Sequence, residues 1–427
     1  MLLIYFKKIN YSKIKIFSEK FVIIGILLFA FFVSFDSGIG RKLINNLFYI
    51  WLLTLNYKKI TFFINANRIF LFILIFAAWI LIGCIFTLNN DYNSYDIFFK
   101  YFLLPILIIS TTIKKEHIQY IISAFLLGMF INEIISYGIY FEVIKSQIFG
   151  FNIVGNKYNP VPFLPSHMEY TLFLSLAIVI SVFSFFNTDS KVIKIILLVF
   201  TLTMITNLFL TTGRTGQFTL LGTLFILIFI YLRHNYKYII LSFLTIIFIF
   251  FMGFFFSDNV NKRLKQGYFD IVKVIEDKNY NTSFGVRLSS YILIPKIIQN
   301  EDFNILYGTG YSKVNSVVQK IQVNEIGSFM KGQLGHLHNS YITIFAGTGL
   351  IGLILLLLIW YYLIVTKIKD DYLNYVRYSF VFIVFLGGFT ENMFRQKEIM
   401  MLGAIFISII IVVSTKYNIM GKTDEKK

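Results

Sequence analysis

Long apolar stretches separated by short polar segments divide most of the chain. They occupy residues 21–36, 43–56, 69–88, 97–113, 118–141, 166–187, 192–212, 215–233, 238–257, 340–366, 374–390 and 398–415. A helix needs about 20 apolar residues to cross a hydrocarbon core roughly 30 Å thick. Continuous apolar runs favour helices over strands, because a helix satisfies its backbone hydrogen bonds within one segment. The pattern predicts an all-α polytopic membrane protein with about 12 transmembrane helices.

Composition and charge agree with this class. Hydrophobic residues make up 57% of the chain and charged residues 14%, which is unlike a soluble globule. Lys and Arg recur in alternate segments, whereas the loop 89–96 has none. Because short cytoplasmic loops carry an excess of Lys and Arg, both termini are expected in the cytoplasm. The net charge of +17 is scattered among loops, so it indicates topology, and no nucleic-acid partner is predicted.

The long polar segment 258–339 divides the chain into three parts. Residues 1–257 hold nine predicted spans, residues 340–427 hold three more and a cytoplasmic tail, and the charge pattern places 258–339 outside the cytoplasm. Apolar residues recur at helical spacing in YFDIVKVIEDKN, VRLSSYILIPKIIQ and SVVQKIQVNEI. We expect short amphipathic helices there, with Pro295 kinking or ending the second. The segment should act as a lid more than as an independent domain.

Several polar residues lie where the predicted spans meet the outer compartment. Arg214 begins the eighth span, His338 and Asn339 precede the tenth, and Arg287 lies in the segment between them. An arginine here could simply reach lipid headgroups, and a histidine could be solvated at a helix start. His336 is only a possible supporting residue, because residues two apart in a helix point to different faces.

Three motifs, which together cover roughly 210–360, resemble the O-antigen ligase and O-antigen polymerase superfamily. HLHNSYITIFAGTGLIGLILLLL is similar to its signature of a His-Asn pair and two glycines three apart, here Gly349 and Gly352. TTGRTGQ resembles the family's arginine at the head of a span, and GVRLSSY with LYGTGYS resembles its loop arginine and glycine-rich turn. PFLPSHMEY departs from the family's asparagine-bearing segment, and its His167 is a possible supporting residue.

The resemblance implies transfer of a glycan from undecaprenyl diphosphate on the periplasmic side of the bacterial inner membrane, within reach of membrane lipids. Arginine binds phosphate oxygens bidentately, so Arg214 and Arg287 are expected to hold the donor diphosphate. Fixed cations there would stabilise the departing diphosphate. An imidazole suits proton removal from a sugar hydroxyl, and His338 is the predicted base. Single displacement would invert the anomeric configuration.

Other residues are assigned supporting roles. Asn339 could orient the His338 ring or cap the helix, and capping is favoured. Glu133 lies in the outer half of a span, where a carboxylate is a functional candidate, and could pair with Arg214. The chain has no Asp-x-Asp, Asp370 and Asp371 are expected in the cytoplasm, and two histidines make a poor metal site. Neither a metal nor a cofactor is therefore predicted.

Several functions are compatible with these features. An O-antigen ligase would move the finished glycan to lipid A-core, whereas a polymerase would extend it on the carrier. An O-linked protein oligosaccharyltransferase shares the signature, and a lipid-linked oligosaccharide flippase has a similar number of spans. The polar residues gather at outer helix ends instead of lining a path through the bilayer, which favours an enzyme. A single large outer loop favours the ligase.

Overall fold

The computed structural model describes residues 2–35, 37–87, 92–148, 150–256, 258–325 and 335–424. Every apolar stretch predicted from the sequence lies largely on helix. The corresponding elements are α1 (Leu2–Phe32), α2 (Ser37–Thr54), α4 (Arg68–Thr87), α5 (Tyr92–Phe98) continuing through the π-turn η2 (Phe99–Leu103) into α6 (Leu104–Thr112), α7 (Lys115–Tyr140), α8 (His167–Asn187), α9 (Lys191–Leu210), α10 (Arg214–Leu232), α11 (Tyr236–Phe256), α16 (Ser340–Val365), α17 (Asp371–Gly387) and α18 (Lys397–Asp424).

Length and composition define which of these helices could cross a membrane. Within the described residues, seven helices are long and apolar enough to cross a membrane. The number rises to eight if the pair Asn56–Ala66 and Arg68–Gly83, bent by 105°, is counted as one span. That pair consists of the 3-10 turn η1 (Asn56–Lys59), α3 (Ile60–Ala66) and the first part of α4. The all-α polytopic class is confirmed, whereas the figure of about 12 spans stays a prediction.

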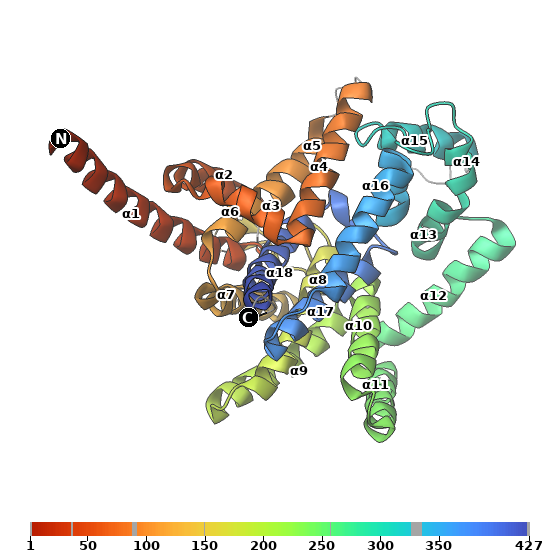
Figure 1. Ribbon diagram of the computed structural model, residues 1–427. Helices are drawn as coiled ribbons and strands as arrows, with labels where there is room; N and C mark the ends of the chain where they lie inside the picture. The colour runs from red at the N-terminus through yellow and green to blue at the C-terminus, as the bar shows by residue number, and fades with distance from the viewer. Residues whose placement is uncertain are drawn as a thin grey trace.

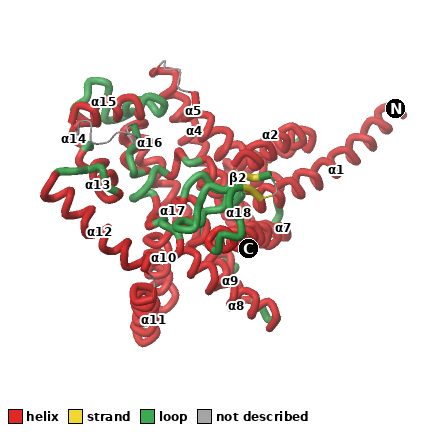
Figure 2. Tube along the Cα trace, turned by 180° about the vertical axis from the view of Figure 1, so that it is seen from behind, coloured by secondary structure: helices red, strands yellow, loops and turns green. Residues whose placement is uncertain are grey.

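Two helices form the centre of the bundle. Within their candidate spans, α18 is 94% buried and α8 is 72% buried. Both are apolar on nearly all sides, as expected of a helix surrounded by other helices. Figure 1 shows α1, α9 and α11 extending away from this centre, and the view from behind in Figure 2 shows the same arrangement. The neighbouring helices therefore pack around α8 and α18.

The described part of segment 258–339 forms four helices: the first leads away from α11, and the other three lie near the start of α16 (Figure 1). They are α12 (Asp258–Asp277), α13 (Ser283–Ile292), α14 (Ile294–Ile298) and α15 (Val314–Glu325). The predicted amphipathic helices are confirmed, and Pro295 lies in the first turn of α14, where a proline is tolerated. A separate apolar cluster fastens the segment to α16: Leu293, Ile297, Val314, Val317, Val318, Ile321, Leu337, Ile342 and Ala346.

Close packing at Gly349 holds the segment 258–339 against α16. Gly349 interrupts α16 with φ 69° and ψ −168°, a conformation that is almost restricted to glycine. A Cβ atom at this position would collide with the backbone of Leu306. The backbone N–H of Leu350 instead donates to Ile305 O at 2.8 Å, and that of Thr309 donates to Ala346 O at 2.8 Å. One glycine of the predicted signature thus permits backbone contact between two distant segments.

Short elements complete the chain. Residues 141–166 contain a hairpin of β1 (Gln147–Ile148) and β2 (Phe151–Asn152), which the apolar pattern did not predict. Between α17 and α18 the chain makes the 3-10 turn η4 (Met393–Arg395). Ser340 ties the start of α16 to this turn, because its hydroxyl donates to Glu391 O at 2.9 Å and accepts from Met393 N at 2.8 Å. This contact brings Glu391 beside the residues that precede α16.

Candidate active site

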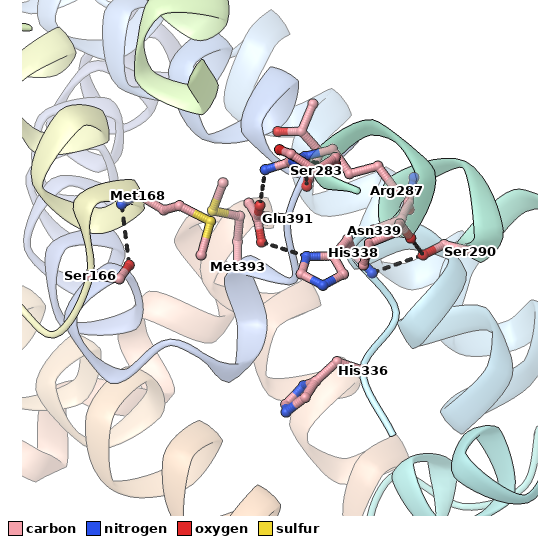
Figure 3. Close-up of polar contacts among 12 residues, drawn as sticks. Ser166, Met168, Ser283, Arg287, Ser290, His336, His338, Asn339, Glu391 and Met393 are labelled. Carbon is pink, nitrogen blue, oxygen red and sulfur yellow. Dashed lines mark hydrogen bonds and ion pairs between the residues drawn. The ribbon is translucent and has the colours of Figure 1, made fainter. Parts of the chain in front are cut away.

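Glu391 bridges an arginine and a histidine that are far apart in the sequence (Figure 3). Arg287 Nη2 lies 2.5 Å from Glu391 Oε1, and His338 Nδ1 lies 3.1 Å from Glu391 Oε2. The Glu391 side chain is only 3% exposed. A buried carboxylate needs compensating partners, and here each oxygen has one. The three side chains therefore form a single hydrogen-bonded unit.

The geometry of this unit assigns the nitrogen atoms of the His338 ring. A carboxylate only accepts hydrogen bonds, so Nδ1 must carry the proton that it donates to Glu391. In a neutral imidazole, Nε2 then keeps its lone pair. Nε2 is buried and has no hydrogen-bond partner among the described residues. The His338 backbone is also fixed, since its N–H donates to Ser290 Oγ at 2.9 Å.

Arg287 is held by groups on two elements. It lies in α13, whose first turn is capped by Thr282, and its Nη1 donates to Ser283 O at 2.6 Å and to Ser283 Oγ at 2.7 Å. Its Nε donates to Thr390 O at 3.1 Å. The sequence motif therefore places the guanidinium against α13 on one side and against the residues before η4 on the other.

Arg214 has a different environment. It begins α10, as predicted, and its Nη1 lies 3.2 Å from Asp270 Oδ2 on α12. The side chains of Arg214 and Asp270 are 31% and 18% exposed, respectively. Asp270 follows two aromatic residues in one of the predicted amphipathic stretches, but nothing in the pattern of the sequence marks its carboxylate as a partner for Arg214.

A cavity of about 500 Å³ brings most of the predicted site residues together. Its lining comes from α8, α10, α12, α13 and the residues that flank α16 and η4. The lining residues are His167, Met168, Thr212, Arg214, Gln266, Asp270, Asn281, Thr282, Ser283, Val286, Arg287, His338 and Glu391. Arg214, Arg287, His338 and His167 thus share one space, although they span more than 170 positions in the sequence. Such a polar cavity can hold an anionic group between two guanidinium groups.

Asn339 has the capping role that was favoured for it. Its Oδ1 accepts from Ile342 N at 2.9 Å, and it occupies the N-cap of α16. Its Nδ2 donates to Tyr291 OH at 2.8 Å. Glu391, instead of Asn339, orients the imidazole of His338. The capping prediction is confirmed, and Asn339 also fastens α13 to α16.

The expectation that His336 and His338 point to different faces is wrong. Both precede α16 in non-helical chain, where the helical spacing of side chains does not apply. Exposure alternates along this segment, with Gly335, Leu337 and Asn339 buried and the two histidines more open. Figure 3 shows both rings on one side of the chain. The prediction assumed that the helix already included both histidines, whereas α16 begins at Ser340.

The proposed pairing of Glu133 with Arg214 is also wrong. Glu133 is 2% exposed in α7, and its carboxyl oxygens have no hydrogen-bond partner among the described residues. Arg214 lies beside Asp270 instead. α7 packs on α1, α8 and α9, whereas α10 packs mainly on α8 and α17, and its first residue, Arg214, contacts Asp270 of α12. A similar depth in the membrane did not imply contact, because the sequence does not show which helices are neighbours.

Sequence reasoning missed Glu391 and Asp270, the two carboxylates that contact the predicted arginines. A signal for Glu391 was present, because a carboxylate directly after an apolar stretch, at the same end as Arg214 and His338, is a candidate partner for them. No comparable signal marked Asp270, since it is one of several acidic residues in 258–339.

The fold and the cavity define a class: a polytopic membrane protein with a site of arginine, histidine and carboxylate side chains at one end of its helices. Residues 199–357 match the family model described as O-antigen ligase, which confirms the resemblance to the O-antigen ligase and polymerase superfamily. The matched segment contains Arg214, Arg287 and His338, whereas Glu391 lies beyond it. A search of curated proteins found no match to the chain. The family supports a membrane enzyme that transfers glycans.

Proposed function

We propose that the protein is an O-antigen ligase, which transfers a glycan from undecaprenyl diphosphate to lipid A-core on the periplasmic face of the bacterial inner membrane. The convergence of Arg214, Arg287 and His338 on one cavity carries this proposal. These residues come from helix α10, helix α13 and the segment before α16, so their meeting is a property of the fold and not of local sequence. A lipid diphosphate and a sugar hydroxyl match the chemistry of the three side chains.

The reaction is a single displacement at the anomeric carbon of the donor. Nε2 of His338 takes the proton of the acceptor hydroxyl, while the hydroxyl oxygen forms a bond to the anomeric carbon of the donor. The bond between the carbon and the diphosphate oxygen breaks, and the electron pair leaves with the diphosphate. Arg214 and Arg287 stabilise the charge that develops there. Attack opposite the leaving group inverts the anomeric configuration.

Glu391 has a positioning role in this scheme. It accepts the Nδ1–H of His338 and so keeps the lone pair on Nε2, and its negative charge stabilises the imidazolium that forms. The same carboxylate holds Arg287. The base and one diphosphate ligand are therefore fixed relative to each other before the substrates bind. Transfer should not require a divalent cation, and we expect it to persist in a chelator.

The lipopolysaccharide of a deletion strain distinguishes a ligase from a polymerase. For a ligase, we expect lipid A-core without polymer, while polymer accumulates on the lipid carrier. Core bearing a single repeat unit would instead indicate a polymerase. Normal lipopolysaccharide together with an unglycosylated protein acceptor would indicate a protein oligosaccharyltransferase. Complementation with the wild-type chain is the control for each reading.

A further inference from the structure

We infer that the acceptor glycan is bound on the side of His338 that faces His336, and that the His336 imidazole contacts it. This assignment rests on the proposed function, because it concerns the hydroxyl group that the donor sugar is transferred to. His336 does not line the cavity that contains the two arginines, so it is not part of the donor site. The inference assigns it to the acceptor instead.

The backbone before α16 places the two histidines together. Asn339 has φ −159° and ψ 120°, and the residues from 336 to 339 lie outside any helix. Leu337, between the histidines, is 2% exposed and belongs to the apolar cluster that fastens the segment to α16. Leu337 is turned inward, and Figure 3 shows the imidazoles of His336 and His338 on one side of the chain.

The orientation of the His338 ring determines the side from which the acceptor hydroxyl approaches. Nδ1 faces Glu391, so the acceptor proton can only be received at Nε2. In Figure 3, Arg287 and Glu391 lie on one side of this ring and His336 lies on the other. An in-line displacement needs the leaving diphosphate and the attacking hydroxyl on opposite sides of the anomeric carbon. With the diphosphate at Arg287, the hydroxyl approaches from the side of His336.

The chemistry of His336 suits a neutral glycan. Partial desolvation of its ring lowers its pKa most, and the charge of Arg395 lowers that pKa further, whereas the carboxylate of Glu391 opposes these effects without reversing them. His336 is therefore neutral at pH 7, with one nitrogen that donates and one that accepts. Adjacent hydroxyl groups of a sugar offer the complementary acceptor and donor. His336 remains exposed in the structure, so the ring is open to such a ligand.

Steady-state transfer with purified lipid-linked donor and lipid A-core acceptor tests this assignment. We expect His336→Ala to raise the KM for the acceptor about 2–10-fold, the loss of a neutral hydrogen bond, with the donor KM unchanged. His336→Gln, which can still donate and accept, should restore much of the acceptor affinity. His234→Ala, at an exposed histidine of the α10–α11 turn, is the matched control.

The outcomes separate this assignment from the proposed function. An unchanged acceptor KM in both His336 variants, with His338→Ala inactive, would overturn the acceptor contact and leave the ligase intact. A raised donor KM would also overturn it, because His336 would then belong to the donor side. If the wild-type chain transfers no glycan from the lipid-linked donor, the proposed function itself fails. Thermal unfolding of each variant shows whether a kinetic change reflects folding.

Discussion

The two arginines of the cavity are held in different ways. Arg287, which is 23% exposed, is hydrogen-bonded to Ser283, Thr390 and Glu391, and its contact with the buried Glu391 is 2.5 Å long. Arg214 has a longer contact of 3.2 Å with Asp270, and both of these side chains are more exposed than Glu391. Ion pairs that are open to solvent contribute little to stability, whereas breaking a buried pair is costly.

This difference suggests different tasks for the two ion pairs. In the proposed reaction, Arg287, Glu391 and His338 form a unit that can stay unchanged, because it joins the proposed base to a proposed ligand of the diphosphate. The Arg214–Asp270 pair joins α10 to α12, and the donor phosphate can replace the carboxylate of Asp270 on the guanidinium. The first unit is a fixed part of the site and the second is exchangeable. Substitutions in each should therefore have effects of different size and kind.

The largest effect is expected at His338. His338→Ala should slow transfer about 10²–10⁴-fold, the usual contribution of a general base, while lipid-linked donor still binds. Asn at position 338 cannot accept and hold a proton, so His338→Asn should be similarly slow. Turnover by purified protein at saturating donor and acceptor measures this. Near-normal turnover of His338→Asn would return the histidine to a structural role.

The next effect concerns Glu391, which acts through His338. Glu391→Gln keeps the shape of the side chain but no longer ensures that Nδ1 carries the proton. We expect kcat to fall about 10–100-fold, by analogy with the carboxylates that orient metal-bound histidines, and the donor KM to change little. Glu301→Gln, at an exposed carboxylate of the segment 258–339, is the control. A higher donor KM with unchanged kcat would instead assign Glu391 to Arg287 alone.

The sequence predicted the individual side chains of this site better than their contacts. Arg214, Arg287 and His338 were identified because polar residues at the outer ends of apolar stretches are few and resemble a known motif. Glu391 and Asp270 were missed, and Glu133 was given the wrong partner. A contact depends on which helices are neighbours, and the apolar pattern is the same whichever order the helices take in the bundle.

The helices themselves were predictable for a simpler reason. A chain that crosses a membrane must satisfy its backbone within each helix, so apolar length locates the long apolar helices directly. The segment before α16 shows where this rule ends, because the helix begins only at Ser340 and His336 lies outside it. The kink at Gly349 was likewise hidden, since only the contact with Leu306 explains why a glycine is needed there.

Replacing each arginine by lysine sharpens the comparison of the two ion pairs. Lysine keeps the charge but cannot reproduce the several hydrogen bonds of Arg287. Arg287→Lys should reduce kcat/KM for the donor about tenfold to a hundredfold, the loss of a charged hydrogen bond. Arg214→Lys should reduce it less, and alanine should be worse at each position. Equal losses for the two lysine variants would contradict the distinction between a fixed and an exchangeable pair.

The smallest effect is expected at Asp270, and its direction is the informative part. If the donor phosphate displaces this carboxylate from Arg214, Asp270→Asn removes a competitor and should lower the donor KM up to about fivefold, in line with the small free energy of an ion pair that is partly open to solvent. Glu276→Gln, at an exposed carboxylate of the same helix, should leave the donor KM unchanged. Initial rates over a range of donor concentrations measure both variants. A raised donor KM in Asp270→Asn, with the control at the wild-type value, would show that Asp270 holds Arg214 in its binding geometry, and both arginines would then belong to fixed units.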